Sequence, residues 1–282
     1  MTYQEAINLS KKRLKENQIY EGFGFGLMLE LCELAQINLY NDKDLEADDL
    51  FLEDYFKKVE RLLNHEPLAY VLGFEWFYGR RFKTNSDVLI PREETQELVG
   101  YVLGDIDEFF HQQAISIFDI GTGSGNLAIT FDLECPQARV FGSDISFEAL
   151  EVARQNNSQL DGSVTFFQGD MAQPFIDAQL KADVILCNPP YIKNKEDVAQ
   201  SVLRYEPHLA LFGGEDGLDF YRQLFDSLDL IRHQKAIIAF EMGYDQREIM
   251  QYEIQTRFSE ARIHFEKDMN NLDRMCFIYF NC

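Results

Sequence analysis

Apolar residues recur at helical spacing along the first part of the chain, up to about residue 66. Leu52, Tyr55 and Val59, for example, fall on one face of a helix. The pattern therefore predicts a small helical domain over residues 1–66. Within it, three closely spaced glycines are predicted to mark a turn between two helices: Gly22, Gly24 and Gly26.

From Tyr70 to Ile90 the pattern changes to aromatic and β-branched residues interrupted by Gly73 and Gly79. Such a run is typical of a β-hairpin. We therefore expect residues 67–90 to connect the helical domain to the remainder of the chain.

After Pro91, short apolar runs alternate with helical stretches. Strands are predicted over 115–120, 139–143, 164–167, 184–187, 236–241, 261–265 and 275–280. Helices are predicted over 124–133, 147–159, 218–231 and 246–258. This alternation indicates an α/β domain over residues 91–282, with a mostly parallel sheet covered on both faces and a final antiparallel pair.

The composition limits the classes of partner. The chain has 282 residues, of which 46% are hydrophobic, and a formal net charge of −22. Proteins that grip nucleic acid usually carry a basic track that neutralises phosphates, and the densest basic group here, Arg80–Lys83, is short. We therefore expect no direct binding to nucleic acid.

The cysteines and the N-terminus indicate a cytoplasmic protein. The five cysteines form no C-x-x-C pair and stand at no zinc spacing to a histidine, so we expect free thiols and no metal site. Residues 1–15 lack a signal-peptide core, and no apolar run approaches the roughly 20 residues of a membrane-spanning helix. We expect no membrane association.

A glycine-rich loop joins the first predicted strand of the α/β domain to its helix. Its sequence is Asp119-Ile120-Gly121-Thr122-Gly123-Ser124-Gly125. Glycines let a backbone approach a ligand closely, although a plain structural turn also accounts for them. A phosphate loop would need Gly-Lys-Ser/Thr, and a dinucleotide fingerprint would need glycine at the position of Asn126.

Two further acids follow the next two strands. Asp144 is placed to accept the hydroxyl groups of a ribose, and Asp170 to accept from an adenine amine while Met171 packs on the ring. Each acid alone is more often a cap or a surface charge. Because the carboxyl ends of parallel strands line the crevice in which open α/β sheets bind ligands, the ordered set predicts a nucleoside-containing cofactor.

The segment Asn188-Pro189-Pro190-Tyr191 follows a buried strand and carries the most specific chemistry. Consecutive prolines cannot donate to a sheet, so pairing stops at Asn188 and a stiff turn follows. The turn presents an amide, carbonyl groups and one aromatic ring. That set suits a planar group with N–H donors, such as an amide or an exocyclic amine.

These residues together resemble the HemK/PrmC family, the peptide chain release factor glutamine methyltransferases. The similarity runs from about residue 60 to the C-terminus. It includes the segments 65–70, 89–92, 119–125, 188–192, 205–207, 213–218 and 241–243. The segment 91–96 departs from the usual form of the family at Glu93 and Gln96. In the same segment, the resemblance implies that Arg92 and Thr95 are wall residues of the active site.

The resemblance implies a Rossmann-like class I methyltransferase with a mixed seven-stranded sheet, preceded by a helical substrate-recognition domain and a hairpin connector. It implies S-adenosylmethionine as cofactor, with S-adenosylhomocysteine as product. The cofactor residues that it implies are Gly121, Thr122, Gly123, Ser124, Gly125, Asp144 and Asn188, to which the strand-end pattern adds Asp119, Asp170 and Met171.

The implied substrate is the glutamine of the Gly-Gly-Gln motif of release factors. We also expect the enzyme to be a monomer. Asn188 and the Pro189 carbonyl are expected to accept the N–H groups of the substrate amide, and Tyr191 to cover it. Pro190 completes the clamp. Glu206 and Arg92 are expected to shape the pocket, with Glu206 holding its loop through a hydrogen bond.

Three other functions stay open on the sequence. The same clamp serves enzymes that methylate a flipped-out nucleic-acid base, although the net charge argues against that substrate. A ribosomal protein is another possible source of the glutamine. A cofactor-binding adaptor without catalysis is the third, and the intact clamp argues against it.

Overall fold

The computed structural model describes residues 1–193 and 198–282. It divides into two compact units. The first unit contains Met1–Phe74 together with Gln200–Tyr205, and the second contains Glu75–Ala199 and Glu206–Cys282. The segment Gln200–Tyr205, which forms helix α10, therefore belongs to the first unit although the pattern assigned it to the α/β domain.

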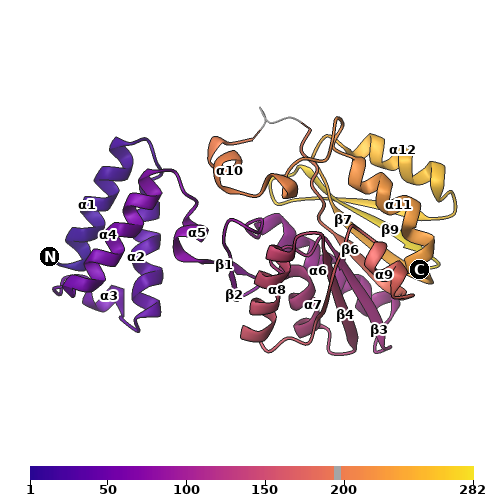
Figure 1. Cartoon of the computed structure of the whole chain (residues 1–282), viewed down its shortest axis with the longest axis horizontal. Coiled ribbons are helices and arrows are strands. Elements are labelled where there is room, and N and C mark those ends of the chain that lie inside the picture. Colours follow the sequence, from indigo (N-terminus) through magenta and orange to yellow (C-terminus); the bar gives the residue numbers. More distant parts are fainter. Residues whose placement is uncertain (194–197) are drawn as a thin grey trace. The chain divides into compact units, whose positions relative to one another are not determined.

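The first unit is helical (Figure 1). Its helices are α1 (Tyr3–Glu16), α2 (Gly22–Leu34), α3 (Leu39–Asp42), α4 (Asp49–Leu63) and α5 (Leu68–Leu72). The predicted apolar face of α4 is buried at Leu52, Tyr55 and Val59. The Tyr55 hydroxyl lies 2.5 Å from Ser10 Oγ and donates to the Gly24 carbonyl at 2.9 Å, which ties α4 to α1 and α2.

The predicted turn at Gly22, Gly24 and Gly26 is wrong, because these residues form the first turns of α2. Tertiary packing explains Gly24. A Cβ on Gly24 would stand 2.4 Å from Ser10 Oγ, so α1 and α2 approach each other more closely than a side chain there permits. Helical glycine is otherwise unfavourable, and the pattern alone gave no sign of this contact.

The predicted connector contains a short helix, α5, before its hairpin. The hairpin pairs β1 (Phe74–Phe77) with β2 (Arg80–Lys83). Phe77 and Phe82 face the core of the second unit, with ring centroids 5.9 Å apart.

Over the described residues, the second unit is built on a seven-stranded sheet in the order β5-β4-β3-β6-β7-β9-β8 (Figure 1). The strands are β3 (Ile115–Ile120), β4 (Ala138–Asp144), β5 (Thr165–Gln168), β6 (Ala182–Cys187), β7 (Arg232–Glu241), β8 (Arg262–Lys267) and β9 (Asp273–Phe280). Strands β3 to β7 are parallel, whereas β9 pairs antiparallel with both β7 and β8. The mixed Rossmann-like fold predicted above is confirmed.

Helices cover both faces of this sheet (Figure 1). On one face, α9 (Gln173–Asp177), α11 (Asp219–Ile231) and α12 (Arg247–Arg257) share a core with Phe118 and Ile120 of β3. On the other, α6 (Glu93–Phe109) and α7 (Asn126–Glu134) share a core with Ile115 and Ile117. α8 (Phe147–Gln159) packs beside α7 and contacts β4 and β5. Alternate residues of β3 thus face opposite helical layers, as a central strand requires.

The predicted strands match the observed ones within a few residues, except that β7 begins at Arg232. The helix predicted from Ser124 begins at Asn126, because Gly125 takes a left-handed conformation (φ 79°) at the N-cap. The pattern did not identify α6 or α9. All five cysteines, each within the described ranges, are free. In the described part of the chain, the helices are too short or too polar to cross a bilayer.

Candidate active site

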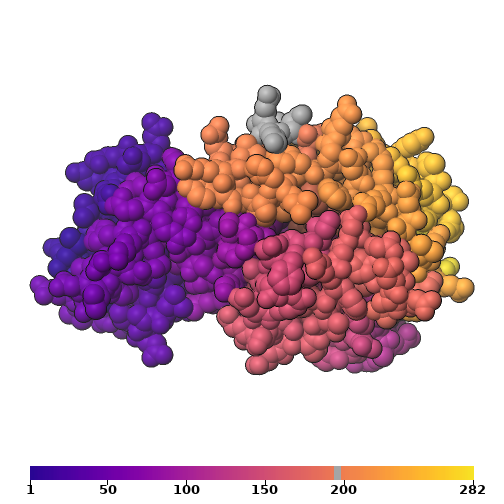
Figure 2. Space-filling model, viewed as in Figure 1, coloured from indigo at the N-terminus to yellow at the C-terminus, as the bar shows by residue number. Residues whose placement is uncertain are grey.

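A cleft opens at the carboxyl ends of β3 to β6, with an empty volume of about 1190 Å³ when its mouth is included. Between β3 and β6 the chain changes the direction in which it adds strands, and such switch points bind ligands in open α/β sheets. In Figure 2 the pink and orange parts of this unit meet along a groove. The lining residues after these strands include Gly121–Ser124, Asp144–Ser146, Gly169–Met171 and Cys187–Pro190.

The glycines of the first loop serve two purposes. Gly121 (φ 74°) and Gly123 (φ 54°) line the cleft, and a Cβ on either would meet nothing within 4 Å. They therefore provide a turn that leaves room for a ligand. Gly125 does not line the cleft among the described residues, and a Cβ there would lie 2.9 Å from Ile129 Cδ1. Because glycine has no side chain, Gly125 can lie close to Ile129 at the start of α7.

Asp119 supports this loop from below. The residue is 1% exposed, and its Oδ2 accepts hydrogen bonds from Thr122 Oγ1 at 2.6 Å and from the Ala128 amide at 3.1 Å. Burial raises the pKa of Asp119 from 3.8 to about 6, against the opposing effect of these bonds. Asp119 also borders the cleft, but its visible contacts hold the loop.

Asp144 and Asp170, both predicted to bind the cofactor, differ in their surroundings. Asp144 accepts the amides of Gly123 and Ser146, each at 2.9 Å, and burial raises its pKa despite these bonds. Each oxygen keeps a lone pair for a ligand hydroxyl. Asp170 is exposed and accepts from Gln223 Nε2 at 2.9 Å. Met171 lines the cleft beside it and packs on the core.

The amide of Asn188 is held from its nitrogen end. Nδ2 donates to Glu241 Oε2 at 3.0 Å and to Thr95 Oγ1 at 3.3 Å. No described residue donates to its Oδ1, and Asn188 lines the cleft. The orientation leaves Oδ1 as an acceptor at the cleft, and the role of Asn188 toward a ligand stays a prediction. Pro189 is buried and also lines the cleft, next to Pro190.

Tyr191 is placed differently from its predicted role of covering the substrate. It is not among the described residues that line the cleft. Its ring packs on the core, and its hydroxyl donates to Glu241 Oε1 at 3.1 Å. The hydroxyl of Tyr191 thus reaches a buried carboxylate. In this structure Tyr191 therefore anchors the turn.

Glu206 makes the predicted tie to its neighbouring loop. Its carboxylate accepts from Arg92 Nη2 at 2.6 Å and from the Ile90 amide at 3.2 Å, and its side chain is 1% exposed. Ile90 and Arg92 line the cleft, whereas Glu206 supports them from behind. The pair thus shapes the wall of the cleft.

The loop after Glu206 lies directly on the proline turn. Ile192 and Phe212 form a parallel bridge, and a Cβ on Gly213 would stand 2.3 Å from the Pro190 carbonyl oxygen. Gln246 fastens the same contact. Its Nε2 donates to the carbonyls of Tyr191 at 3.1 Å and Gly217 at 3.3 Å, and its Oε1 accepts the Gly243 amide.

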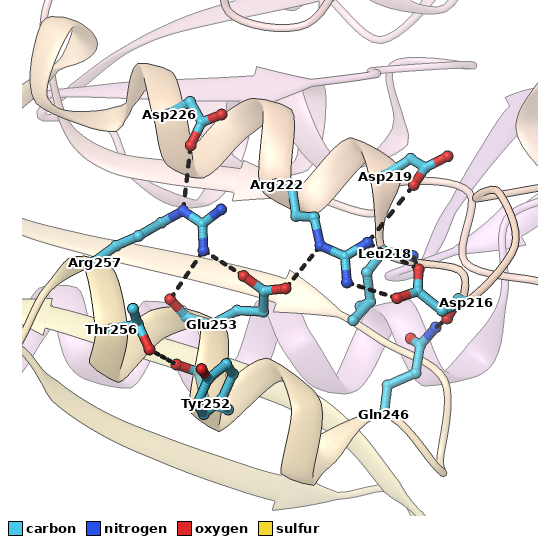
Figure 3. A network of polar contacts seen from close by, with 10 residues as sticks. All are labelled: Asp216, Leu218, Asp219, Arg222, Asp226, Gln246, Tyr252, Glu253, Thr256 and Arg257. Carbon is cyan, nitrogen blue, oxygen red and sulfur yellow. Dashed lines mark hydrogen bonds and ion pairs between the residues drawn. The ribbon is translucent and has the colours of Figure 1, made fainter.

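Arg222 fixes the far end of this loop. Figure 3 shows its guanidinium between Asp216 and Glu253, with Gln246 beside Asp216. Arg222 Nη2 lies 2.6 Å from Asp216 Oδ2, and its Nε lies 2.7 Å from Glu253 Oε1. The hydrogen bond from Arg222 lowers the pKa of Asp216. The loop is thereby joined to α11 and α12.

Comparison with known proteins places the chain in a family. It is 38% identical over 286 residues to a release factor glutamine methyltransferase from Bacillus anthracis, covering 98% of this chain and 99% of that relative. The chain belongs to the release factor glutamine methyltransferase family. A second member, from Bacillus subtilis, is 42% identical over 211 residues, and the matched region covers 74% of this chain and 73% of that relative.

Broader comparisons agree with a methyltransferase domain and its fold. The family model described as "Methyltransferase small domain" matches residues 106–214. The crystal structure of a methyltransferase from Pyrococcus furiosus shares the fold, with a TM-score of 0.51 and 15% identity, covering 79% of this chain and 98% of that one. The resemblance found in the sequence is confirmed.

In this member of the release factor glutamine methyltransferase family, the sequence did not predict a role for two residues that support the site, Glu241 and Gln246. Glu241 ends β7, so the rule that found Asp144 and Asp170 at strand ends also applies to it. Gln246 offered no such signal, because only the folded chain brings the carbonyls of Tyr191 and Gly217 to its amide.

Proposed function

We propose that this protein transfers a methyl group from S-adenosylmethionine to the side-chain amide nitrogen of the glutamine in the Gly-Gly-Gln motif of release factors. The observation that carries the proposal is the Asn188 amide, which donates to Glu241 and leaves Oδ1 available at the cleft. A glutamine amide brings the N–H donors that such an acceptor needs. The relatives named above support the choice of substrate.

The residues around the cleft fit S-adenosylmethionine. The left-handed turns at Gly121 and Gly123 leave open space where side chains would stand, and Asp144 keeps acceptor capacity for ribose hydroxyls. Asp170 and Met171 lie at the next strand end, where the adenine is proposed to bind. When bound, S-adenosylmethionine supplies a methyl group on a positively charged sulfur.

The chain's own residues would act mainly by orientation. An amide nitrogen is a poor nucleophile because its lone pair is delocalised into the carbonyl. Asn188 Oδ1 and the Pro189 carbonyl each accept one N–H of the substrate, which fixes the nitrogen and stabilises the positive charge that grows on it. The methylated nitrogen is strongly acidic, so its proton leaves to solvent.

The remaining parts of the protein would recognise the body of the release factor. The helical unit is the proposed docking domain, and the net charge of −22 suits a basic face around the Gly-Gly-Gln loop. Glycines beside the target glutamine would let it protrude into a narrow cleft. We place this reaction in the cytoplasm, carried out by a monomer.

Mass spectrometry of a release factor incubated with this protein and methyl-labelled S-adenosylmethionine tests the proposal. One labelled methyl group is expected on the peptide that contains Gly-Gly-Gln, and none on a factor whose glutamine is replaced by alanine. Asn188→Ala should lower the rate at least about 100-fold while cofactor affinity changes only several-fold. Label on a ribosomal protein or on RNA instead of the factor would contradict the assignment.

A further inference from the structure

The buried carboxylate of Glu241, at the end of β7, lies behind the proline turn formed by residues 188–191. It is 2% exposed and accepts from Thr95 Oγ1 at 2.6 Å, from Asn188 Nδ2 at 3.0 Å and from Tyr191 Oη at 3.1 Å. Burying a carboxylate is costly unless hydrogen bonds compensate it. The burial of this carboxylate beside the Asn188 amide therefore needs a physical explanation.

The reason follows from the two ends of the Asn188 amide, which have similar shape and opposite hydrogen-bonding character. An ionised carboxylate can only accept. The Thr95 hydroxyl donates its proton to Glu241, so it can only accept a hydrogen bond from Asn188. A flipped amide would set Oδ1 against these two acceptors in a site of low dielectric, which is strongly unfavourable.

The other oxygen of Glu241 fixes the second half of the turn. Tyr191 donates to Oε1, and Arg274 Nη1 lies 3.5 Å from the Tyr191 hydroxyl. Burial raises the pKa of Glu241, while the bonds from Thr95 and Tyr191 and the charge of Arg274 act in the opposite direction. Arg274 is itself held by Asp268.

We propose that Glu241 is a positioning residue that locks the Asn188 amide with Oδ1 toward the cleft and so selects a substrate that presents N–H donors. The inference rests on the proposed function and extends it to a group that does not touch the substrate. A substrate carboxamide can donate an N–H to Asn188 Oδ1, whereas a substrate carboxylate has no donor and would be repelled by this oxygen.

The orientation of Asn188 can be measured without any substrate, by NMR of its side-chain amide. The signal is assigned by its disappearance in Asn188→Asp. In the wild type, the proton bonded to Glu241 should exchange slowly with solvent. In Glu241→Gln, the amide can flip, and exchange should become at least about tenfold faster. Equal exchange in the two proteins would overturn the lock.

Kinetics test the consequence. Glu241→Gln should lower kcat about 100-fold, with the affinity for S-adenosylmethionine unchanged within about threefold. The matched control is Asp105→Asn, the same change at a partly buried carboxylate that accepts from Tyr279 at 2.8 Å away from the cleft. It should keep the wild-type kcat. A kcat for Glu241→Gln within about threefold of wild type would contradict the proposal.

Exchanging the two groups separates orientation from simple support. In Asn188→Asp combined with Glu241→Gln, the amide introduced at position 241 donates to the carboxylate introduced at position 188. The second oxygen of that carboxylate faces the cleft as an acceptor. The double variant should recover kcat at least about tenfold over Asn188→Asp alone, whose two carboxylates repel. Additive losses would overturn the lock. If Glu241→Gln fails to fold, Thr95→Val replaces it, with kcat expected about tenfold down and faster exchange at Asn188.

The two hypotheses fail in different ways. If the wild type places no methyl group on release factors, the proposed function fails, and the exchange measurement still decides the lock. If the wild type is active and Glu241→Gln matches it in both measurements, only the lock fails.

Discussion

At the scale of single residues, three acids at successive strand ends show how one sequence pattern leads to different environments. Asp119 is fully buried under its loop, Asp144 is partly buried and binds backbone amides, and Asp170 is exposed. Burial raises the pKa of both Asp119 and Asp144, because it disfavours the charged form more than the hydrogen bonds from their donors favour it. Identical residue types therefore contribute differently to stability and binding.

Asp119→Asn should change how stability depends on pH. Because the pKa of Asp119 is raised from 3.8 to about 6, the folded state favours the protonated acid. Its stabilising contribution is fully present below pH 3.8 and is lost as the pH rises through about 6. The free energy of unfolding of the wild type should thus fall relative to the variant by about 3 kcal/mol across that range.

Urea unfolding of both proteins at several pH values between these limits measures the difference. Buried acids that do not interact with Asp119, such as Glu241, are common to both proteins and cancel in the comparison. Parallel pH curves for wild type and Asp119→Asn would show that the pKa of Asp119 is not raised.

At the scale of elements, close backbone approach decides two features. Helix α2 carries glycine where α1 crosses it, and the loop around Gly213 and Gly217 lies against the carbonyls of Pro190 and Tyr191. In both places a missing side chain allows one segment to fix another. The second contact holds the end of the proline turn, at Pro190 and Tyr191.

Two alanine substitutions in α2 should have opposite effects. Gly24→Ala puts a Cβ 2.4 Å from Ser10 Oγ, whereas Gly26→Ala has Leu68 Cδ2 as its nearest neighbour at 3.7 Å. Alanine favours a helix by up to about 1 kcal/mol, so Gly26→Ala should raise the melting temperature. Gly24→Ala should lower it, because overpacking costs about 1–3 kcal/mol. Thermal unfolding followed by circular dichroism decides; equal shifts would refute the crossing contact.

Gln246→Glu should release the loop that lies over the proline turn. The variant replaces a buried donor to the carbonyls of Tyr191 and Gly217 by a carboxylate that repels them. We expect a loss of about 2–4 kcal/mol in stability, faster proteolysis between residues 206 and 218, and little remaining methyl transfer.

The matched control for Gln246→Glu is Gln173→Glu on the surface, where the side chain bonds Asp177. It should change stability by less than about 0.5 kcal/mol. Similar proteolysis of the two variants would mean that Gln246 does not hold the loop.

At the scale of the whole molecule, two compact units and a strongly negative charge define the protein. The second unit carries every described residue that lines the cleft. The first unit has its own core, which includes Ile7, Leu27 and Val59. This separation is consistent with the roles proposed above, in which the second unit holds the cleft and the first recognises the release factor.

The charge of −22 predicts a salt effect that depends on the size of the substrate. Long-range attraction to the proposed basic face of a release factor would be screened by ions, so kcat/KM should fall roughly tenfold between about 50 mM and 500 mM salt. A short Gly-Gly-Gln peptide lacks the basic face, and its kcat/KM should change less than about threefold. Initial rates with both substrates measure this. Equal salt dependence would exclude electrostatic recognition of the factor's body.

Local sequence patterns determined the order of elements in the α/β domain and the residues that gather at its cleft. Period and length define a strand such as β3 locally, and parallel strands necessarily bring Thr122, Asp144 and Asn188 to one edge. The same local signals missed α6 and placed a turn at Gly24, because those features depend on what packs against them.

Only the tertiary structure decided how the proline turn is held. Asn188, Thr95 and Glu241 come from three distant segments, and no spacing along the chain links them. The same holds for Tyr191, whose ring faces Glu241 rather than the cleft. The physical reason is that side-chain period and turn chemistry are local, whereas the partner of a buried polar group is set by whichever segments the sheet brings within about 3 Å.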